Sequence, residues 1–501
     1  MRGAKDTLRA PSVTRLRSIK TSKQRSSQKK MSLESLKQGN KTTLRQRVLN
    51  TFRLRPLSVT RKSLYSLFKN KNSTKKQGFN NPSVKNQIDQ VSYLNTICSD
   101  SGECLVFGRE NQGIKGLFDG FVDFKYLTDV RKVGERSSNG FVLNLQYERM
   151  NYKVNTLLKS ARAKYSDNLY YEYLVGTKFI NRVNLFFPCF TETYHLFKHK
   201  SASSKELIEN DNMDIAEFSN LIDMNICDEK RIKNSLTCIK NSCQEGYNFA
   251  ILLQYIDEPI SFDSFVKKHD KDKFFKALMM GILVQIYAPL SYLKEDFTHY
   301  DLHLKNVLLY KLPKGKFVEI KYKDERDSSI ITIQTNYIVK IIDYGRCYFG
   351  NLGNDKYMTS NSLVKLIKGT KECTDKGLGN VGYNFLDDPM KGNFYISSTQ
   401  KNTSHDLRFA HLLSEKSNIA FSEIGGLIEY EGFYGTPQNV SHKNRDYYIR
   451  DVGDMYVFLQ KYFEDPIEFV EKVDESIGCI EVYMTNKLCE KEMKFFPSNS
   501  N

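Results

Sequence analysis

The sequence predicts an α+β protein that begins with a disordered basic tail, continues with a strand-rich part and ends with a helix-rich part. Three observations lead to this prediction. Phe141–Tyr147 (FVLNLQY) alternates apolar and polar residues, as a half-buried strand does. Lys273–Leu293 is long and apolar enough to form a buried helix. Residues 1–85 contain 23 Lys and Arg but only two acidic residues.

The tail carries most of the charge of this 501-residue chain. Residues 1–85 have a net charge of +21, whereas the remaining residues have a net charge of −4. The tail is polar and poor in aromatic residues, so it cannot bury enough apolar surface to offset the entropy lost on ordering. A basic tail of this kind binds nucleic acid or an acidic surface through counterion release. A solvated tail without a partner explains the composition equally well.

Cysteine usage and hydropathy indicate an intracellular protein that is not secreted. The ten cysteines include no CxxC pair, which argues against a zinc ribbon or a dense disulfide framework. Met1–Lys30 lacks the apolar segment of a signal peptide. The longest apolar run, Ala277–Leu293, is shorter than the roughly 20 residues that a membrane span needs. We therefore expect no membrane span.

Further elements follow from local patterns on either side of a polar stretch. Tyr152–Lys159 is predicted to be a second strand after a turn at Met150–Asn151, and Asn168–Ile180 has helical spacing. Residues 198–245 are polar and are interpreted as a surface insertion. The segments after this stretch are predicted to be a buried strand at Asn248–Ile256 and a helix at Ser261–Lys268.

Three polar side chains in segments that also contain apolar runs have the chemistry of a phosphoryl-transfer site. Asp301 and Asn306 lie in THYDLHLKNVLLY, and Asp343 follows the apolar run YIVKII, 37 residues after Asn306. Phosphoryl transfer needs a carboxylate that accepts the proton of the attacking hydroxyl, which suits Asp301. It also needs oxygen ligands for a metal ion, which suit Asn306 and Asp343. Gly345 is expected to permit the turn that directs Asp343.

The two motifs resemble the protein-kinase catalytic loop, H-R-D-L-x-x-x-N, and the D-F-G motif that follows it. The resemblance implies a two-lobed protein-kinase-like fold that uses ATP and Mg²⁺ (or Mn²⁺). The implied β-rich N-lobe covers residues 105–256, with the insertion around 198–245, and the helical C-lobe covers residues 257–490.

Individual roles are also implied by this resemblance. Asp301 corresponds to the catalytic base, Asn306 to the second metal ligand and Asp343 to the main metal ligand. His299 corresponds to a structural residue beneath the loop. Asp406, in NTSHDLR, corresponds to an aspartate that holds the catalytic loop by its backbone amides, although a helix N-terminal acid fits the same position.

The glycine-rich loop of the implied N-lobe has one candidate segment. Val133–Val142 (VGERSSNGFV) resembles such a loop, with Gly134 and Gly140 in place of the usual three glycines. A plain glycine-containing hairpin turn explains the same residues. Tyr255–Glu258 lies where the segment that contacts adenine is expected.

The ATP lysine has two candidates. In protein kinases this lysine contacts the α- and β-phosphates and pairs with a helix glutamate. Glu172 in YYEYLVG is the expected glutamate, although a solvated helix acid also fits. Lys159 ends an apolar run (LLK) and is preferred, whereas Lys153 has the more usual separation from Glu172 but a polar context.

The catalytic segment also departs from protein kinases. Tyr300 replaces the arginine that reads a phosphorylated activation loop, which puts that route of switching in doubt. His303 replaces the lysine of Ser/Thr kinases, and the sequence DLH is more like aminoglycoside and choline kinases. No A-P-E motif follows Asp343.

A wider resemblance covers about residues 130–460. DNLYYEYLVG, INRVNLFFPCFTETY, HYDLHLKNVLLY, IIDYGR and NTSHDLR together resemble the serine/threonine protein kinases of large nucleocytoplasmic DNA viruses, especially iridoviruses. This resemblance implies a kinase that phosphorylates protein Ser and Thr hydroxyls in the host cytoplasm or the virion. A small-molecule phosphotransferase and a pseudokinase scaffold that uses the basic tail are the alternatives.

Overall fold

A computed structural model describes the chain in fifteen segments. They are residues 111–133, 140–161, 167–200, 207, 213–223, 237–238, 240–242, 244–269, 275–351, 359–367, 384–385, 396–416, 422–428, 449–463 and 475–498. All described residues belong to one compact unit, Asn81–Asn501. The predictions for the basic tail and for Gly134 lie outside the described residues.

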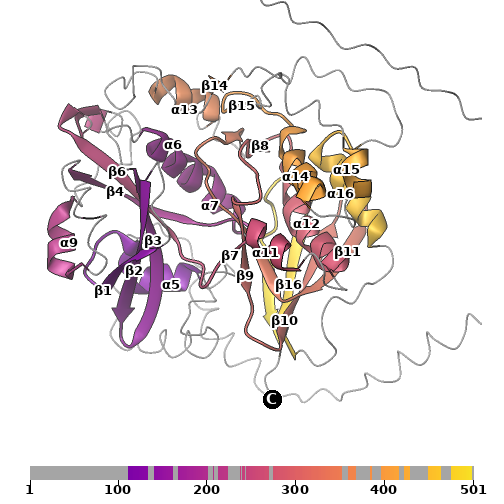
Figure 1. The fold of residues 1–501 in the computed structure, drawn as a ribbon, viewed down its shortest axis with the longest axis horizontal. Helices are drawn as coiled ribbons and strands as arrows, with labels where there is room; N and C mark the ends of the chain where they lie inside the picture. Colours follow the sequence, from indigo (N-terminus) through magenta and orange to yellow (C-terminus); the bar gives the residue numbers. More distant parts are fainter. Residues whose placement is uncertain are drawn as a thin grey trace, which may run out of the picture. The chain divides into compact units, whose positions relative to one another are not determined.

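The described residues form a mixed α+β fold that contains a curled antiparallel sheet of six strands (Figure 1). The strand order is β1-β2-β3-β6-β4-β5. The two strands predicted first are confirmed as β2 (Gly140–Arg149) and β3 (Tyr152–Ala161). Met150 and Asn151 join them with φ values of 55° and 63°, as in a type I′ turn. The other strands are β1 (Leu127–Val133), β4 (Thr193–Lys200), β5 (Ile222–Asp223) and β6 (Tyr247–Gln254).

The helix predicted at Asn168–Ile180 is present and packs against this sheet. It consists of α6 (Asp167–Val175), a π-helical turn at Gly176–Ile180 and α7 (Asn181–Val183). A Cβ atom on Gly176 would lie 2.1 Å from Oγ1 of Thr193 in β4, so only glycine allows this close approach. The approach fixes the position of α6, which carries Glu172.

Parts of the polar stretch at 198–245 belong to the six-stranded sheet and its apolar core. β4 continues to Lys200 and pairs with β5, so the first residues of the stretch belong to the sheet. α9 (Ile215–Leu221) buries Phe218 completely in the same apolar core as Tyr147. A few well-placed apolar residues are enough to anchor part of a segment that is polar on average.

The predicted helices of the second part are confirmed as α11 (Phe262–His269) and α12 (Phe275–Tyr292). α12 is long and apolar enough to cross a membrane by length and composition, but 83% of its 18 residues are buried inside the protein. It is therefore the core helix of this part. The remaining helices are α5 (Asn111–Leu117), α13 (Ser360–Ile367), α14 (Arg408–Lys416), α15 (Ser422–Leu427) and α16 (Val452–Tyr462), with short 3₁₀ turns η1 (Asp119–Phe121) and η7 (His405–Leu407).

The second part contains more β-structure than the sequence predicted. A four-stranded sheet has the order β11-β10-β16-β17, in which β10 and β16 are parallel although about 160 residues separate them. Local patterns do not reveal such a distant pairing, and the expectation of a mainly helical second part is corrected accordingly. These strands are β10 (Lys316–Asp324), β11 (Ser329–Thr335), β16 (Glu475–Met484) and β17 (Lys494–Pro497).

Smaller sheets surround the segment that contains Asp301. One sheet has the order β12-β9-β7, and β8 pairs with β13. β12 covers the apolar run that precedes Asp343. The strands are β7 (Ile260–Ser261), β8 (Phe297–Thr298), β9 (Val307–Lys311), β12 (Tyr337–Ile341) and β13 (Tyr348–Phe349), and a separate pair joins β14 (Asn384–Phe385) to β15 (Ile396–Ser397).

Candidate active site

Antiparallel pairing of β9 with β12 brings the two sequence motifs together. β9 begins directly after Asn306, and β12 ends two residues before Asp343. Val307 is paired with Ile341, and the backbone N–H of Ile342 donates to the carbonyl oxygen of Asn306 at 3.1 Å. The two predicted metal ligands therefore lie on neighbouring strand ends, although 37 residues separate them in the sequence.

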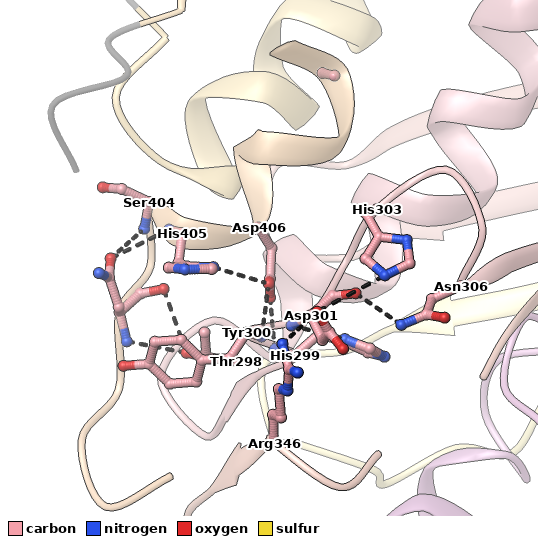
Figure 2. A network of polar contacts seen from close by, with 12 residues as sticks. Thr298, His299, Tyr300, Asp301, His303, Asn306, Arg346, Ser404, His405 and Asp406 are labelled. Atoms are coloured by element: carbon pink, nitrogen blue, oxygen red, sulfur yellow. Dashed lines mark hydrogen bonds and ion pairs between the residues drawn. The ribbon is translucent and has the colours of Figure 1, made fainter. Parts of the chain in front are cut away.

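Asp406 holds the loop that contains Asp301 (Figure 2). Its buried carboxylate accepts hydrogen bonds from the backbone N–H groups of His299 at 2.7 Å and Tyr300 at 3.0 Å. This is the contact that the sequence resemblance implied for Asp406. Tyr300 has φ 62°, a left-handed conformation that is unfavourable for a tyrosine. The two charge-assisted hydrogen bonds offset that strain and fix the direction in which the loop leaves β8.

His299 connects the loop to the segment before Asp343. Its imidazole is fully buried, and Nδ1 accepts a hydrogen bond from the backbone N–H of Asp301 at 3.3 Å. Nε2 lies 3.1 Å from the carbonyl oxygen of Ile342 and therefore carries the proton in this arrangement. The ring thus positions Asp301 and Ile342 relative to each other, which agrees with the structural role expected for it.

Asn306 and Arg346 fix Asp301 from two sides. The Asn306 amide nitrogen Nδ2 donates to the backbone carbonyl of Asp301 at 3.0 Å, so Oδ1 is the amide atom that a cation would bind. The Asp301 carboxylate itself forms an ion pair with Arg346, whose Nη1 atom lies 2.9 Å from Oδ1. Sequence reasoning missed Arg346. Its position directly after the Asp-Tyr-Gly motif was the available signal.

Of the two candidate lysines, Lys159 is the one that contacts Glu172. Its Nζ atom lies 2.9 Å and 2.8 Å from the two carboxylate oxygens of Glu172, and 3.2 Å from Oδ1 of Asp343. Lys153 instead pairs with Glu148 on the neighbouring strand at 3.5 Å, and its side chain is half exposed. Glu172 is a buried acid rather than a solvated one.

Lys159, Glu172 and Asp343 shift one another's pKa values. Burial would lower the pKa of Lys159, but the carboxylates of Asp343 and Glu172 outweigh this effect and raise the pKa. Burial and the nearby Asp343 carboxylate raise the pKa of Glu172 to about 7, although the adjacent Lys159 ammonium group acts to lower it. The charge of Lys159 is also the main cause that holds the pKa of Asp343 below its ordinary value. Lys159 therefore remains a cation and Asp343 an anion.

The turn around Asp343 differs in one respect from the sequence expectation. Gly345 was expected to provide the unusual backbone conformation, whereas Asp343 itself is left-handed, with φ 69°. The next side chain fixes this turn, because the Tyr344 hydroxyl donates to the carbonyl oxygen of Ile341 at 2.6 Å and accepts from the N–H of Thr191 at 2.9 Å. Strain held by surrounding contacts is typical of functional sites.

Tyr171 is a second residue that the sequence did not single out. It lies beside Glu172 in α6, and its buried hydroxyl donates to the carbonyl oxygen of Cys347 at 2.7 Å. Cys347 follows Arg346 in the segment after Asp343. One hydrogen bond therefore ties the helix that carries Glu172 to the segment that carries Arg346.

The other predicted site residues are less informative. Gly140 is the first residue of β2, whereas residues 134–139 of the predicted glycine-rich loop lie outside the described residues. Tyr255–Glu258 connects β6 to β7.

Within the described ranges, no group of three or more His, Cys, Asp or Glu side chains is arranged to hold a metal ion. The Asp343 carboxylate and the Asn306 carbonyl are hard oxygen donors, and such a pair suits Mg²⁺, which keeps several water ligands.

Comparison with known proteins adds no family to this description. No model of a known protein family matches the chain, and no curated protein sequence matches it.

Proposed function

We propose that this protein is an ATP-dependent phosphotransferase with a two-lobed protein-kinase-like fold. One observation carries the proposal: Lys159 contacts Glu172 and Asp343 together, at the turn that β9 and β12 bring beside Asn306. A lysine paired with a buried glutamate, next to a carboxylate and an amide oxygen, is the set of groups that positions a nucleoside triphosphate and its metal ion.

Each residue has a role that its contacts support. The Lys159 ammonium, held by Glu172, would bind the α- and β-phosphates of ATP. Asp343 and Oδ1 of Asn306 would hold Mg²⁺ or Mn²⁺, which when bound neutralises charge on the phosphates. Asp301 would accept the proton of the attacking hydroxyl. The hydrogen bonds that Asp406 and the His299 imidazole accept from the loop backbone keep the loop in place without needing a phosphorylated residue.

The acceptor that we propose is a Ser or Thr hydroxyl of a protein, as in the viral kinases that the sequence resembles. The proposed setting is the host cytoplasm or the virion, with the basic residues 1–85 available to bind nucleic acid or another acidic surface. A small alcohol is the second candidate acceptor, because His303 and the missing A-P-E motif depart from protein kinases.

A transfer assay with labelled ATP separates these proposals. Purified full-length protein is incubated with γ-³²P-labelled ATP, Mg²⁺ and either casein or a panel of aminoglycosides and choline. Label in casein or in the protein itself, abolished by Asp301→Ala, supports a protein kinase. Label only in small alcohols would reject the protein acceptor. Nucleotide binding without any transfer would favour a pseudokinase.

A further inference from the structure

Arg346 occupies a defined position beside the proposed catalytic base. Its guanidinium group lies 2.9 Å from Oδ1 of Asp301, and its side chain remains about one-third exposed. The Arg346 backbone is also held in place, because the Ser398 hydroxyl donates to its carbonyl oxygen at 2.8 Å. Figure 2 shows Arg346 and His303 approaching Asp301 from different segments.

His303 is the other basic side chain at this carboxylate, but its contacts favour the neutral form. Nε2 lies 3.8 Å from the same Oδ1 atom, beyond hydrogen-bond distance. Nδ1 accepts a hydrogen bond from the backbone N–H of Lys305 at 3.2 Å, so this nitrogen carries a lone pair. Burial also lowers the pKa of His303, against the attraction of Asp301. A guanidinium, in contrast, stays charged at every pH of interest.

We propose, on the basis of the proposed phosphotransferase function, that Arg346 is the positioning residue of the acceptor side of the site. Its guanidinium holds the Asp301 carboxylate in one orientation and supplies the fixed positive charge there. The Arg346 contact falls on Oδ1, and His303 also lies on the side of Oδ1, which assigns Oδ2 to the acceptor hydroxyl.

The transfer step balances with these assignments. The acceptor oxygen forms a bond to the γ-phosphorus while the bond from that phosphorus to the β,γ-bridging oxygen breaks, and ADP leaves. The acceptor proton moves to Oδ2 of Asp301, so the product is a phosphate ester. Arg346 exchanges no atom in this step. It keeps Oδ2 directed at the hydroxyl, and small errors in such placement cost up to about 100-fold in rate.

The test compares steady-state kinetics of variants of the full-length protein. Arg346→Met should lower kcat by about 10- to 100-fold, while the KM for ATP stays within about threefold, because Lys159 and Asp343 are untouched. Arg346→Lys should retain an intermediate kcat. Adding His303→Lys to Arg346→Met should recover at least about fivefold in kcat, since a lysine at position 303 approaches the same oxygen with a permanent charge. Arg450→Met, which removes an exposed arginine paired with Asp454 in α16, is the matched control and should leave kcat unchanged.

The outcomes distinguish this inference from the proposed function. An active wild type whose kcat is unchanged or raised in Arg346→Met would overturn the inference and leave the phosphotransferase assignment standing. A raised kcat would mean that the ion pair with Arg346 hinders Asp301 from accepting the proton. A fall in kcat without recovery in the double variant would reject the charge role. If Arg346→Met does not fold, Arg346→Lys takes its place. A kcat of Arg346→Lys that is lowered and then raised by His303→Lys would support the inference, and an unchanged kcat would overturn it. A wild type that transfers no phosphate would overturn both proposals.

Discussion

Lys159 on β3 bonds both carboxylate oxygens of Glu172 on α6, at 2.9 Å and 2.8 Å. The two residues are only 13 positions apart, yet they lie on different elements that the sheet and the close approach of Gly176 to Thr193 bring together. The pair is asymmetric in exposure, because Glu172 is buried whereas the lysine side chain is 29% exposed. The lysine is therefore held by a buried partner, while part of its side chain remains exposed.

This asymmetry predicts that the two candidate lysines behave differently. Lys159→Met should lower the rate of phosphoryl transfer by about 100-fold or more, which is the usual effect of losing one positioned donor to a developing charge. Lys153→Met is the matched control, because this lysine lies on the same strand but is half exposed and pairs with Glu148. Transfer rates of the two variants at saturating ATP provide the check, and equal rates would reject the assignment of Lys159.

Asp406 should contribute to both stability and activity. Asp406→Ala leaves two buried backbone N–H groups without their acceptor, and we expect a loss of about 2–5 kcal/mol in the free energy of unfolding. Asp406→Asn keeps one acceptor oxygen and should lose less. Urea denaturation of the three proteins measures the difference, and an unchanged midpoint in Asp406→Ala would show that the loop does not depend on this carboxylate.

Lys340 should make stability increase with pH. It is fully buried in β12, and burial lowers its pKa from 10.5 to about 7, while Nζ donates to the carbonyl oxygen of Pro188 at 2.6 Å. Between these two values the unfolded chain binds a proton at Lys340 that the folded chain does not. Stability from this residue therefore rises with pH, by at most about 1.4 kcal/mol per pH unit, and falls as pH drops toward 7.

The matched variant for this effect is Lys340→Met, which keeps the length of the side chain without a titrating group. The slope of unfolding free energy between pH 7.5 and 9.5 (a range of about two units within the window) should be smaller in Lys340→Met than in the wild type. Comparing slopes removes the pH-independent loss of the hydrogen bond to Pro188. Parallel curves would mean that Lys340 is charged in the folded protein.

Tyr171 should control the position of Glu172. Tyr171→Phe removes the hydrogen bond to the carbonyl oxygen of Cys347 and should cost about 0.5–1.5 kcal/mol of stability. Because it loosens α6, it should also weaken ATP binding by a few-fold, measured by titration calorimetry. Tyr147→Phe is the control, since within the described part of the chain the Tyr147 hydroxyl is buried without a hydrogen-bond partner. Equal ATP affinity in both variants would contradict this role.

The sequence predicted those secondary-structure elements that have a clear local pattern and those site residues that lie in recognisable motifs. The strands β2 and β3 and the helix α12 followed from apolar patterns over short segments. Lys159 was preferred as the partner of Glu172 because it ends an apolar run and because the resemblance to protein kinases implies such a pair. The contact between Asp406 and the loop was expected only through the resemblance, because spacing alone does not show which carboxylate meets which backbone amide.

Other features depend on distant contacts that no local pattern contains. The parallel pairing of β10 with β16 and the ion pair of Arg346 with Asp301 join residues about 160 and 45 positions apart. The left-handed backbone of Asp343 was also unexpected, since sequence rules assign such conformations to glycine and Gly345 was available nearby. Tyr344 fixes that turn through hydrogen bonds to residues of two other segments.

The central claim is that Asp301 is the base of a phosphoryl-transfer site that Asp343 and Lys159 complete. Single-turnover transfer from γ-³²P-labelled ATP, with enzyme in excess and ATP occupancy matched by direct binding, compares the wild type with Asp301→Asn. We predict an unchanged Kd for ATP and a rate lower by about 10²–10⁴-fold in the variant, as expected for loss of a general base. Transfer by Asp301→Asn at the wild-type rate, or a wild type that binds no ATP, would contradict the claim.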